Sequence, residues 1–210
     1  MTRMADVKKV IEIIDKIAVD IEEQKHFLTE LDNVIGDGDH GINMARGFKA
    51  VQEVEPTFAD KDIGAILRTV GMKLVSTVGG SAGPLYGTAF MQAGAFMKGK
   101  TEADIHDFSG ILEKMIAGVQ KRGKAVQGEK TMLDSMFPAK EALDAALAAG
   151  EDGKAALAAA VKAAEEGIEY TKTIIATKGR ASYLGERSLG HQDPGATSFT
   201  LMLKDVADLA

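Results

Sequence analysis

Three aspartates, Asp32, Asp37 and Asp39, lie within a stretch of eight residues, and the last two belong to the sequence Gly36-Asp37-Gly38-Asp39-His40-Gly41. Carboxylates held this close repel one another unless protons or cations neutralise them. Oxygen ligands with no thiol and at most a neighbouring imidazole favour Mg²⁺ over zinc or copper. Because Mg²⁺ in proteins usually keeps water ligands or takes phosphate oxygens, the aspartates predict a metal site completed by phosphates.

Other interpretations of this loop depend on its surroundings. The glycines match the G-x-G-x-x-G of a dinucleotide-binding turn, but residues 27–34 continue a helical pattern where that turn requires a strand. An EF-hand loop starting at Asp37 would place Gly41 and Phe48 at ligand positions, which excludes it. These residues alone leave one alternative open, in which Asp37 and Asp39 are ordinary turn and N-cap residues.

The second candidate segment is residues 78–88, Val-Gly-Gly-Ser-Ala-Gly-Pro-Leu-Tyr-Gly-Thr, between two predicted helices. Paired glycines let backbone N–H groups turn toward an anion, and the start of the next helix adds a favourable dipole. No G-K-[ST] follows, so this is not a Walker loop. A tight turn between helices, with Pro84 at the first helical position, is the alternative.

The third candidate segment is residues 178–195, long, irregular and marked by glycines. Long connections of this kind inside a compact domain are often functional lids. Arg180, Arg187 and His191 could supply positive charge there. An acidic metal loop, an anion turn and a basic lid are together what phosphoryl transfer requires, since that chemistry depends on positioning and charge neutralisation.

The composition limits the other possibilities. A length of 210 residues suits one domain, which we expect to span residues 1–210. A net charge of −6 without a basic block argues against nucleic acid as a partner. The absence of cysteine excludes disulfides and thiol chemistry. The N-terminus is apolar only at helical intervals, so we expect no signal peptide, no membrane association and a cytoplasmic location.

Apolar residues recur at helical spacing through most of the chain, which predicts an all-α fold of about eight helices. We expect helices over residues 7–31, near 41–43 onward, over 63–78, over 105–119, twice within 138–176 with a break at 150–153, and over 199–206. No run of alternating residues predicts a strand.

In combination these motifs resemble the nucleotide-binding L subunits of bacterial dihydroxyacetone kinases over essentially the whole chain. The matching residues are LDNVIGDGDHGINMARGF, DKDIG, VGGSAGPLYGT, RGKA, GEKTMLD and KGRASYLGERSLGHQDPGATS. The resemblance implies an antiparallel barrel of eight helices with a nucleotide pocket at one end.

The resemblance also implies roles for particular residues. Two Mg²⁺ ions would be held by Asp32, Asp37 and Asp39. The other implied contacts to ADP or ATP are His40, Gly41, Ile42, Asn43, Ser81 and Ala82 for the phosphates, Gly123, Thr131 and Met132 for the adenine, and Arg180, Asp193, Pro194 and Gly195 closing over the ligand, with Arg180 as the catalytic residue. The family turn is often GGASG, whereas Ser81 precedes Ala82 here, so the hydroxyl that meets phosphate is not assigned.

Free-standing L subunits resemble the form driven by the phosphoenolpyruvate phosphotransferase system. In that form bound ADP is phosphorylated by a phosphohistidine on an M subunit and passes the phosphoryl group to dihydroxyacetone on a K subunit. We therefore expect a monomer that docks K and M partners at the pocket mouth. An L subunit that exchanges ATP, and a regulatory module whose nucleotide sets the shape offered to a partner such as a transcription regulator, remain alternatives.

Two further enzymatic hypotheses concern the same residues. His40 or His191 could itself carry the phosphoryl group, but this leaves the aspartates without a purpose. A two-metal hydrolase would release phosphate from ATP without an acceptor. His26 and His106 lie within helical patterns and are interpreted as structural.

Overall fold

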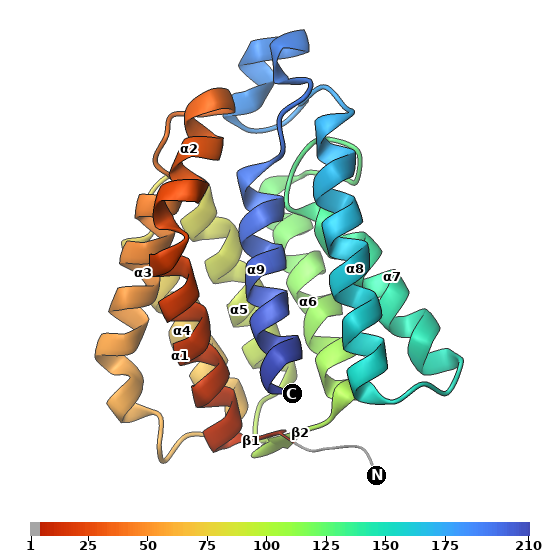
Figure 1. Ribbon diagram of the computed structural model, residues 1–210. Coiled ribbons are helices and arrows are strands. Elements are labelled where there is room, and N and C mark those ends of the chain that lie inside the picture. The colour runs from red at the N-terminus through yellow and green to blue at the C-terminus, as the bar shows by residue number, and fades with distance from the viewer. Residues whose placement is uncertain (1–4) are drawn as a thin grey trace.

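The computed structural model describes residues 5–210, and this part of the chain is almost entirely helical (Figure 1). Its α-helices are α1 (Val7–Glu23), α2 (Lys25–Ile35), α3 (His40–Val54), α4 (Ile63–Thr77), α5 (Ala82–Phe96), α6 (Ile105–Gly123), α7 (Leu133–Ala148), α8 (Gly153–Lys172) and α9 (Pro194–Leu209). The remaining elements are two 3-10 helices, η1 (Glu55–Thr57) and η2 (Arg180–Ser188), and two strands, β1 (Ala5–Asp6) and β2 (Glu102–Ala103). The predicted all-α class is confirmed.

Eight of these helices form a closed ring. α1 contacts α3, each helix from α3 to α8 contacts the next, and α9 returns to α1. α2 extends beyond the upper end of α1 in Figure 1 and contacts α3, α9 and η2. The ring agrees with the predicted barrel of about eight helices.

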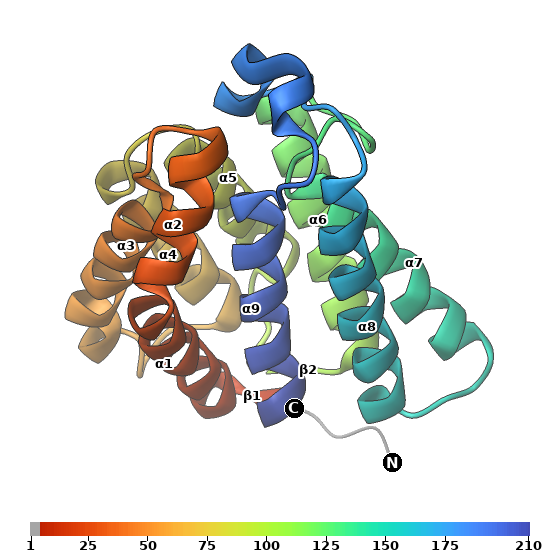
Figure 2. The ribbon, with the colours of Figure 1, turned by 45° about the horizontal axis from the view of Figure 1, so that its top comes forward.

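Neighbouring helices of the ring run in opposite directions, so their connections gather at its two ends (Figures 1 and 2). The connections at the upper end in Figure 1 are residues 36–39, 78–81, 124–132 and 173–193. All three candidate segments of the sequence lie in, or begin from, these upper connections. The alternation of helices therefore brings segments far apart in sequence to one end of the molecule. We refer to residues 173–193 as the lid segment.

One cluster of buried apolar side chains fills the space between the helices and includes residues from all nine of them. In α1 the buried positions Ile14, Ile17 and Ile21 follow the helical spacing and are at most 4% exposed. Burying such a stripe is the main source of helix stability in a domain of this size.

The predicted first helix, residues 7–31, is wrong in one respect, because it is interrupted at Gln24. Six residues lie between the buried Ile21 and Leu28, and because five of them are polar and Phe27 is exposed, they give no buried apolar contact that would hold a straight helix against the core. The bend sends α2 toward the lid segment, where Ile35 packs with Ala176 and Ala181.

Two smaller expectations also need correction. α7 begins at Leu133 rather than near Pro138, which lies inside the helix and cannot donate a hydrogen bond to the preceding turn. β1 and β2 pair antiparallel, with Ala5 opposite Ala103, although no strand was predicted. Two residues are too few to show an alternating pattern in the sequence.

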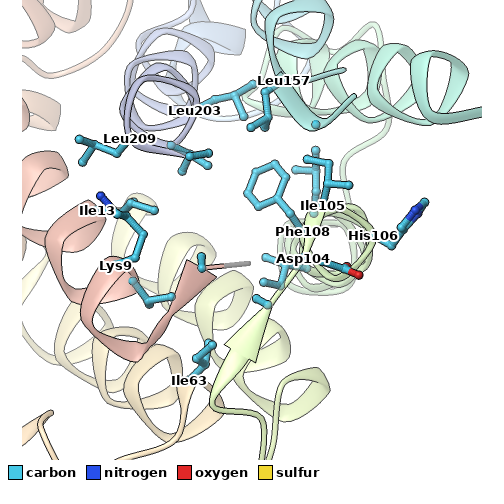
Figure 3. A pocket seen from close by; sticks show the side chains of 18 of the residues that line it. Lys9, Ile13, Ile63, Asp104, Ile105, His106, Phe108, Leu157, Leu203 and Leu209 are labelled. Carbon is cyan, nitrogen blue, oxygen red and sulfur yellow. The ribbon is translucent and has the colours of Figure 1, made fainter. Parts of the chain in front are cut away.

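A cavity of about 840 Å³ opens inside the ring at its lower end, away from the aspartates (Figure 3). Apolar side chains from α1, α6 and α9, among them Ile13, Phe108 and Leu203, point into it, and His106 points away. The two ends of the ring therefore differ in chemistry, because the polar candidate residues lie at the upper end. None of the helices in residues 5–210 combines the length and apolar character needed to cross a membrane.

A buried carboxylate between α1 and α9 predicts a pH dependence of stability. Asp205 is 2% exposed, its Oδ2 has no hydrogen-bond partner among the described residues, and its Oδ1 lies 3.4 Å from the Lys16 ammonium. Burial raises the pKa of Asp205 to about 7, helped by the neighbouring Asp20 carboxylate and opposed by Lys16. The folded protein therefore keeps this proton over a pH range in which the unfolded chain loses it.

Between about pH 4 and pH 7 the free energy of unfolding should fall as the pH rises, as far as this group is concerned. Asp205→Asn removes that loss. We expect the variant to be more stable than the parent at pH 8 by about 1–2 kcal/mol, a Tm increase of a few degrees, with little difference at pH 4. Thermal unfolding of both proteins at the two pH values checks this, and a variant that is less stable at both would contradict it.

Candidate functional site

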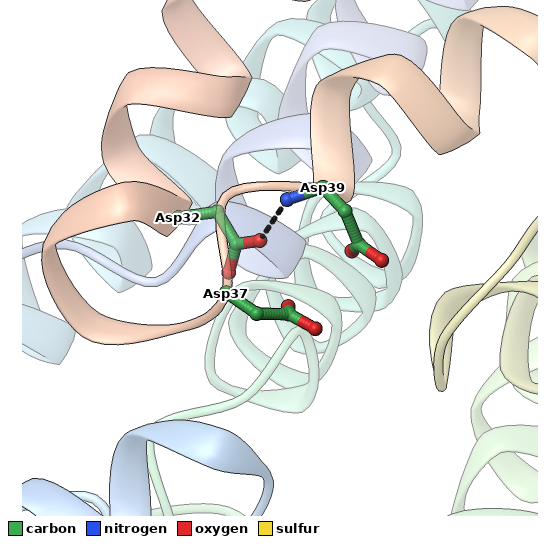
Figure 4. A group of neighbouring side chains, drawn as sticks. All are labelled: Asp32, Asp37 and Asp39. Atoms are coloured by element: carbon green, nitrogen blue, oxygen red, sulfur yellow. Dashed lines mark hydrogen bonds between the residues drawn. The ribbon is translucent and has the colours of Figure 1, made fainter.

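Asp32, Asp37 and Asp39 converge at the upper end of the ring (Figure 4). Each offers a carboxylate oxygen, and the three oxygens lie within 4.8 Å of one another. Asp32 is buried, Asp39 is half-buried and Asp37 is exposed. Oxygen donors at this separation suit a hard cation such as Mg²⁺, with its remaining positions open to other ligands.

Asp32 is fixed by the start of α3. It lies in the last turn of α2, and its Oδ2 accepts hydrogen bonds from the backbone N–H groups of Asp39 (2.9 Å) and His40 (3.1 Å). These are two of the N–H groups that a helix start leaves without partners. Asp39 holds the N-cap position of α3, but its own side chain makes no capping hydrogen bond. Asp39 therefore stands at the N-cap position that the alternative gave it, but Asp32 supplies the capping bonds, and the Asp39 carboxylate is left for other contacts.

Steric constraints explain why glycines occur in this loop. A β-carbon at Gly36 would lie 2.0 Å from Oδ1 of Asp32, so a side chain there would displace that carboxylate. Gly38 has a φ of +72°, a left-handed conformation that L-residues rarely adopt. The spacing Gly-Asp-Gly-Asp therefore serves to fold the loop back so that its aspartates face Asp32.

The lid segment reaches this cluster through Arg180, the first residue of η2. Its Nε lies 2.8 Å from Oδ2 of Asp37 in an ion pair, while the Arg180 side chain stays 63% exposed. The guanidinium thus partly neutralises the aspartates from the open side. An arginine here can pair with the carboxylate or turn to an anion bound beside it.

The turn between α4 and α5 lies against the start of α3. Asn43 is buried, and its Oδ1 accepts from a guanidinium nitrogen of Arg46 at 2.6 Å. Its Nδ2 has no hydrogen-bond partner among the described residues, and a β-carbon at Gly79 would lie 3.0 Å from that atom. A buried donor without a partner is costly and usually indicates a missing ligand or water. The amide is therefore oriented by Arg46 and free to donate toward the turn.

Ser81 is the exposed N-cap of α5, and its side chain makes no capping bond. Ala82 is the first residue of the helix, so Pro84 occupies the third position rather than the expected first. Gly80 precedes them with a φ of +63°. Backbone N–H groups at a helix start without a side-chain cap can receive an anion.

The residues expected around the adenine are partly brought together. A β-carbon at Gly195 would lie 3.5 Å from Cβ of Met132, so these two positions adjoin across the connections 124–132 and 173–193. Thr131, half-buried, donates its backbone N–H to Asp134 at 2.8 Å. Gly123 ends α6 instead, where a β-carbon would lie 3.0 Å from a methyl group of Leu85.

The other predicted contacts have distinct surroundings. Ile42 is half exposed on the first turn of α3, beside the buried Gly41, and Pro194 is buried at the first turn of α9. Asp193 caps α9 through a hydrogen bond from the N–H of Ala196 at 2.7 Å. Burial raises the pKa of Asp193 to about 7, although this hydrogen bond opposes the rise.

His40 is turned into the core. Its Nε2 lies 2.9 Å from Oγ of Ser198, which is 2.7 Å from the Tyr86 hydroxyl, and that hydroxyl donates to the carbonyl of Gly195. Burial lowers the pKa of His40 against the charges of Asp32 and Asp39, which favours a neutral ring. The His40 side chain therefore links α3, α5 and α9, and only its backbone meets the aspartate loop.

Sequence reasoning assigned no role to two buried residues of the GEKTMLD segment. Lys130 donates its ammonium protons to the backbone carbonyls of Thr171, Ile174 and His191. Asp134 accepts from the N–H groups of Gly128 and Thr131. The sequence offered one indication of these roles, because Lys130 and Asp134 are charged residues in a segment that otherwise resembles the start of a helix.

Comparison with known proteins places this geometry in a family. Residues 34–208 match the model of the DAK2 domain. The chain is 46% identical over 184 residues to the ADP-binding subunit of the PEP-dependent dihydroxyacetone kinase of Escherichia coli, covering 88% of both chains. It is 39% identical over 206 residues to the ADP-binding subunit of the PTS-dependent enzyme of Lactococcus lactis, covering 98% of this chain and 99% of that one.

A solved structure agrees with these matches. The dihydroxyacetone kinase of C. freundii in complex with AMP-PNP and Mg²⁺ superposes with a TM-score of 0.69 at 25% identity. The alignment covers 95% of this chain and 33% of that protein, so the likeness concerns one third of the larger enzyme. With a family model matching most of its residues and relatives of equal length matching nearly end to end, the chain belongs to the DAK2 domain family of dihydroxyacetone kinases.

Proposed function

We propose that this protein is the nucleotide-binding subunit of a dihydroxyacetone kinase and that residues 1–210 act as one nucleotide-binding domain. It holds ADP, and a phosphoryl group from the phosphohistidine of an M subunit reaches dihydroxyacetone on a K subunit through that nucleotide. The observation that carries the proposal is the convergence of Asp32, Asp37 and Asp39 beside an uncapped helix start and the unpartnered amide of Asn43.

The donor set fits Mg²⁺. Asp32, Asp37 and Asp39 would hold the cation, and we propose two ions, as the resemblance implies. When bound, Mg²⁺ neutralises phosphate charge that an acidic protein of net charge −6 could not otherwise accommodate. The cluster has the oxygen ligands and the open side that such an ion requires, because the capping bonds engage only Oδ2 of Asp32 and leave its Oδ1 and the Asp39 carboxylate for other ligands.

The other residues act directly on the nucleotide in this proposal. The amide of Asn43 and the backbone at Gly41, Ser81 and Ala82 donate hydrogen bonds to phosphate oxygens, with His40 and Ile42 shaping the same helix start. The adenine lies against Gly123, Thr131 and Met132, and Asp193 to Gly195 close one side. Arg180 releases Asp37, and its positive charge then stabilises the phosphoryl group during its transfer.

The alternative in which His40 is the phosphorylated carrier is disfavoured by its surroundings. Its ring is buried and its Nε2 is engaged by Ser198. A histidine nitrogen that accepts a phosphoryl group must be accessible to the molecule that donates the group. These contacts argue against His40 as the carrier. We propose that the phosphorylated imidazole belongs to the M subunit, while His40 positions the backbone of the aspartate loop.

Reconstitution with purified K and M subunits tests the proposal. Phosphorylation of dihydroxyacetone should require this protein, Mg²⁺ and a phosphohistidine donor regenerated from phosphoenolpyruvate, and it should not require added ATP. Turnover driven by ATP alone would favour the exchanging subunit. Phosphate release from ATP without any acceptor, at a comparable rate, would favour the hydrolase. With K and M as its partners, we propose that the protein works in the cytoplasm.

A further inference from the structure

Lys130 is a buried lysine whose ammonium group forms no salt bridge with a described carboxylate and is shielded from solvent. It is 1% exposed, and its salt-bridge distance to every described carboxylate exceeds 4.0 Å. Its three protons face three backbone carbonyls, those of Thr171, Ile174 and His191. An ammonium group has three donors and no acceptor, so this cage satisfies it completely.

The three carbonyls lie at the two ends of the lid segment or directly beside them. Thr171 lies in the last turn of α8, Ile174 follows that helix, and His191 lies just before α9. Lys130 itself lies between α6 and α7, 41 residues before Thr171 and 61 before His191. One side chain therefore joins both ends of the lid to the connection 124–132.

The surrounding contacts hold Lys130 in a strained conformation. Its φ is +62°, which is unusual for a residue with a β-carbon and persists only where neighbouring contacts determine it. Asp134 supplies these contacts by accepting from the backbone of Gly128 and Thr131, on either side of the lysine. Burial lowers the pKa of Lys130, and the charges of Asp193 and Asp134 oppose this change.

The residues on either side of this cage are those proposed to hold the nucleotide. Thr131 and Met132 follow Lys130 directly, and Asp193 follows His191 by two residues. The N–H of Asp193 also donates to Oγ1 of Thr171 at 3.0 Å, which adds a second link beside the ammonium. A shift of the cage would therefore move both sides of the proposed adenine site relative to each other.

We infer that Lys130 is a positioning residue, an internal cation that fixes the lid segment against residues 131–132 and thereby sets how tightly the adenosine half of the nucleotide is held. This inference rests on the proposed function. It assigns Lys130 no contact with the phosphates, which the aspartates and Asn43 bind on another part of the upper end.

The test compares ADP with pyrophosphate, both with Mg²⁺, because pyrophosphate lacks the adenosine half. Lys130→Met keeps most of the length of the side chain and removes the ammonium. We expect its affinity for ADP to fall about 10- to 100-fold, since misplacing one side of a site has effects of this size, while affinity for pyrophosphate stays within about twofold. Equal losses for both ligands, or an unchanged affinity for ADP, would overturn the inference.

Lys124→Met is the matched control, because Lys124 lies in the same connection, is also left-handed with a φ of +51°, and is exposed. It should bind ADP like the parent. If Lys130→Met does not fold, Lys130→Gln, which keeps two donors, serves for the same comparison. Failure of the parent protein to bind ADP with Mg²⁺ would count against the proposed function instead.

Hydrogen exchange of the nucleotide-free parent protein tests whether the Lys130 ammonium holds the lid segment in place. The N–H of Gly190 donates to the carbonyl of Lys172, and that of Asp193 to Thr171, so both depend on the junction that Lys130 holds. Slow exchange at these two amides in nucleotide-free protein, lost in Lys130→Met, is expected. Rapid exchange in the parent would show that the ammonium does not fix the lid segment.

Discussion

Asp37→Asn is expected to reduce phosphoryl transfer about 10²- to 10³-fold in the reconstituted system, with little effect on folding. Asp37 is exposed in the connection between α2 and α3, so the change removes no core contact. It does remove one negative charge from the carboxylate cluster that we propose holds Mg²⁺ beside the phosphates. Initial rates across a Mg²⁺ titration measure the effect, and the variant should need more Mg²⁺ than the parent.

The matched control is Asp152→Asn. Asp152 caps α8 at the lower end of the ring by accepting from the N–H of Ala155, and asparagine is an equally good cap. Its activity should stay within about twofold of the parent, as expected for a neutral surface substitution. Parent-like turnover and Mg²⁺ dependence in Asp37→Asn would remove the aspartate cluster from the mechanism.

Arg180→Ala is expected to lower the transfer rate about 10³-fold while leaving the Mg²⁺ requirement almost unchanged. The guanidinium is the charged group that the lid segment brings to the aspartates, and its ion pair with Asp37 places it beside the cluster where we propose that the phosphates bind. An arginine facing the transferred group acts mainly in the transition state, so the maximal rate should change more than the affinity for ADP.

Two further variants test whether the effect depends on the guanidinium group of Arg180 and on its place beside the aspartates. Arg180→Lys should recover little activity, because an ammonium cannot reproduce the planar set of donors. Arg68→Ala removes an exposed arginine from the outer face of α4 and should behave like the parent. If Arg180→Ala weakened ADP binding and the maximal rate were untouched, Arg180 would be a binding residue and not the catalytic one.

Much of the fold could be predicted because its signals are local. The apolar stripe of α1 follows the period of a helix, and residues 138–176 are rich in strong helix formers, so helices were expected in both regions, as the structure confirms. The bend at Gln24 was missed because it depends on what lies on either side of a polar stretch. Whether Ile35 continues a straight helix or turns to meet Ala176 is decided by tertiary packing.

In the candidate site, too, features that depend on nearby residues could be predicted, and those that depend on tertiary contacts could not. Asp32, Asp37 and Asp39 could be found because they are close in sequence and their chemistry is specific. The position of the His40 ring could not be predicted, since its partner Ser198 lies 158 residues away.

Lys130 was missed for the same reason, because its acceptors are backbone carbonyls, which any residue supplies and no sequence pattern records. Spacing thus identifies groups that act as neighbours, whereas groups that act across the ring require the structure.

The nucleotide content of the protein as purified tests most directly whether ADP is a bound coenzyme. We would denature it with acid, separate the released nucleotide by chromatography, and quantify nucleotide and magnesium against protein. We expect ADP in nearly equimolar amount together with Mg²⁺, as for a coenzyme that is recharged in place. A protein that carries no nucleotide and binds neither ADP nor ATP when Mg²⁺ is supplied would contradict this expectation.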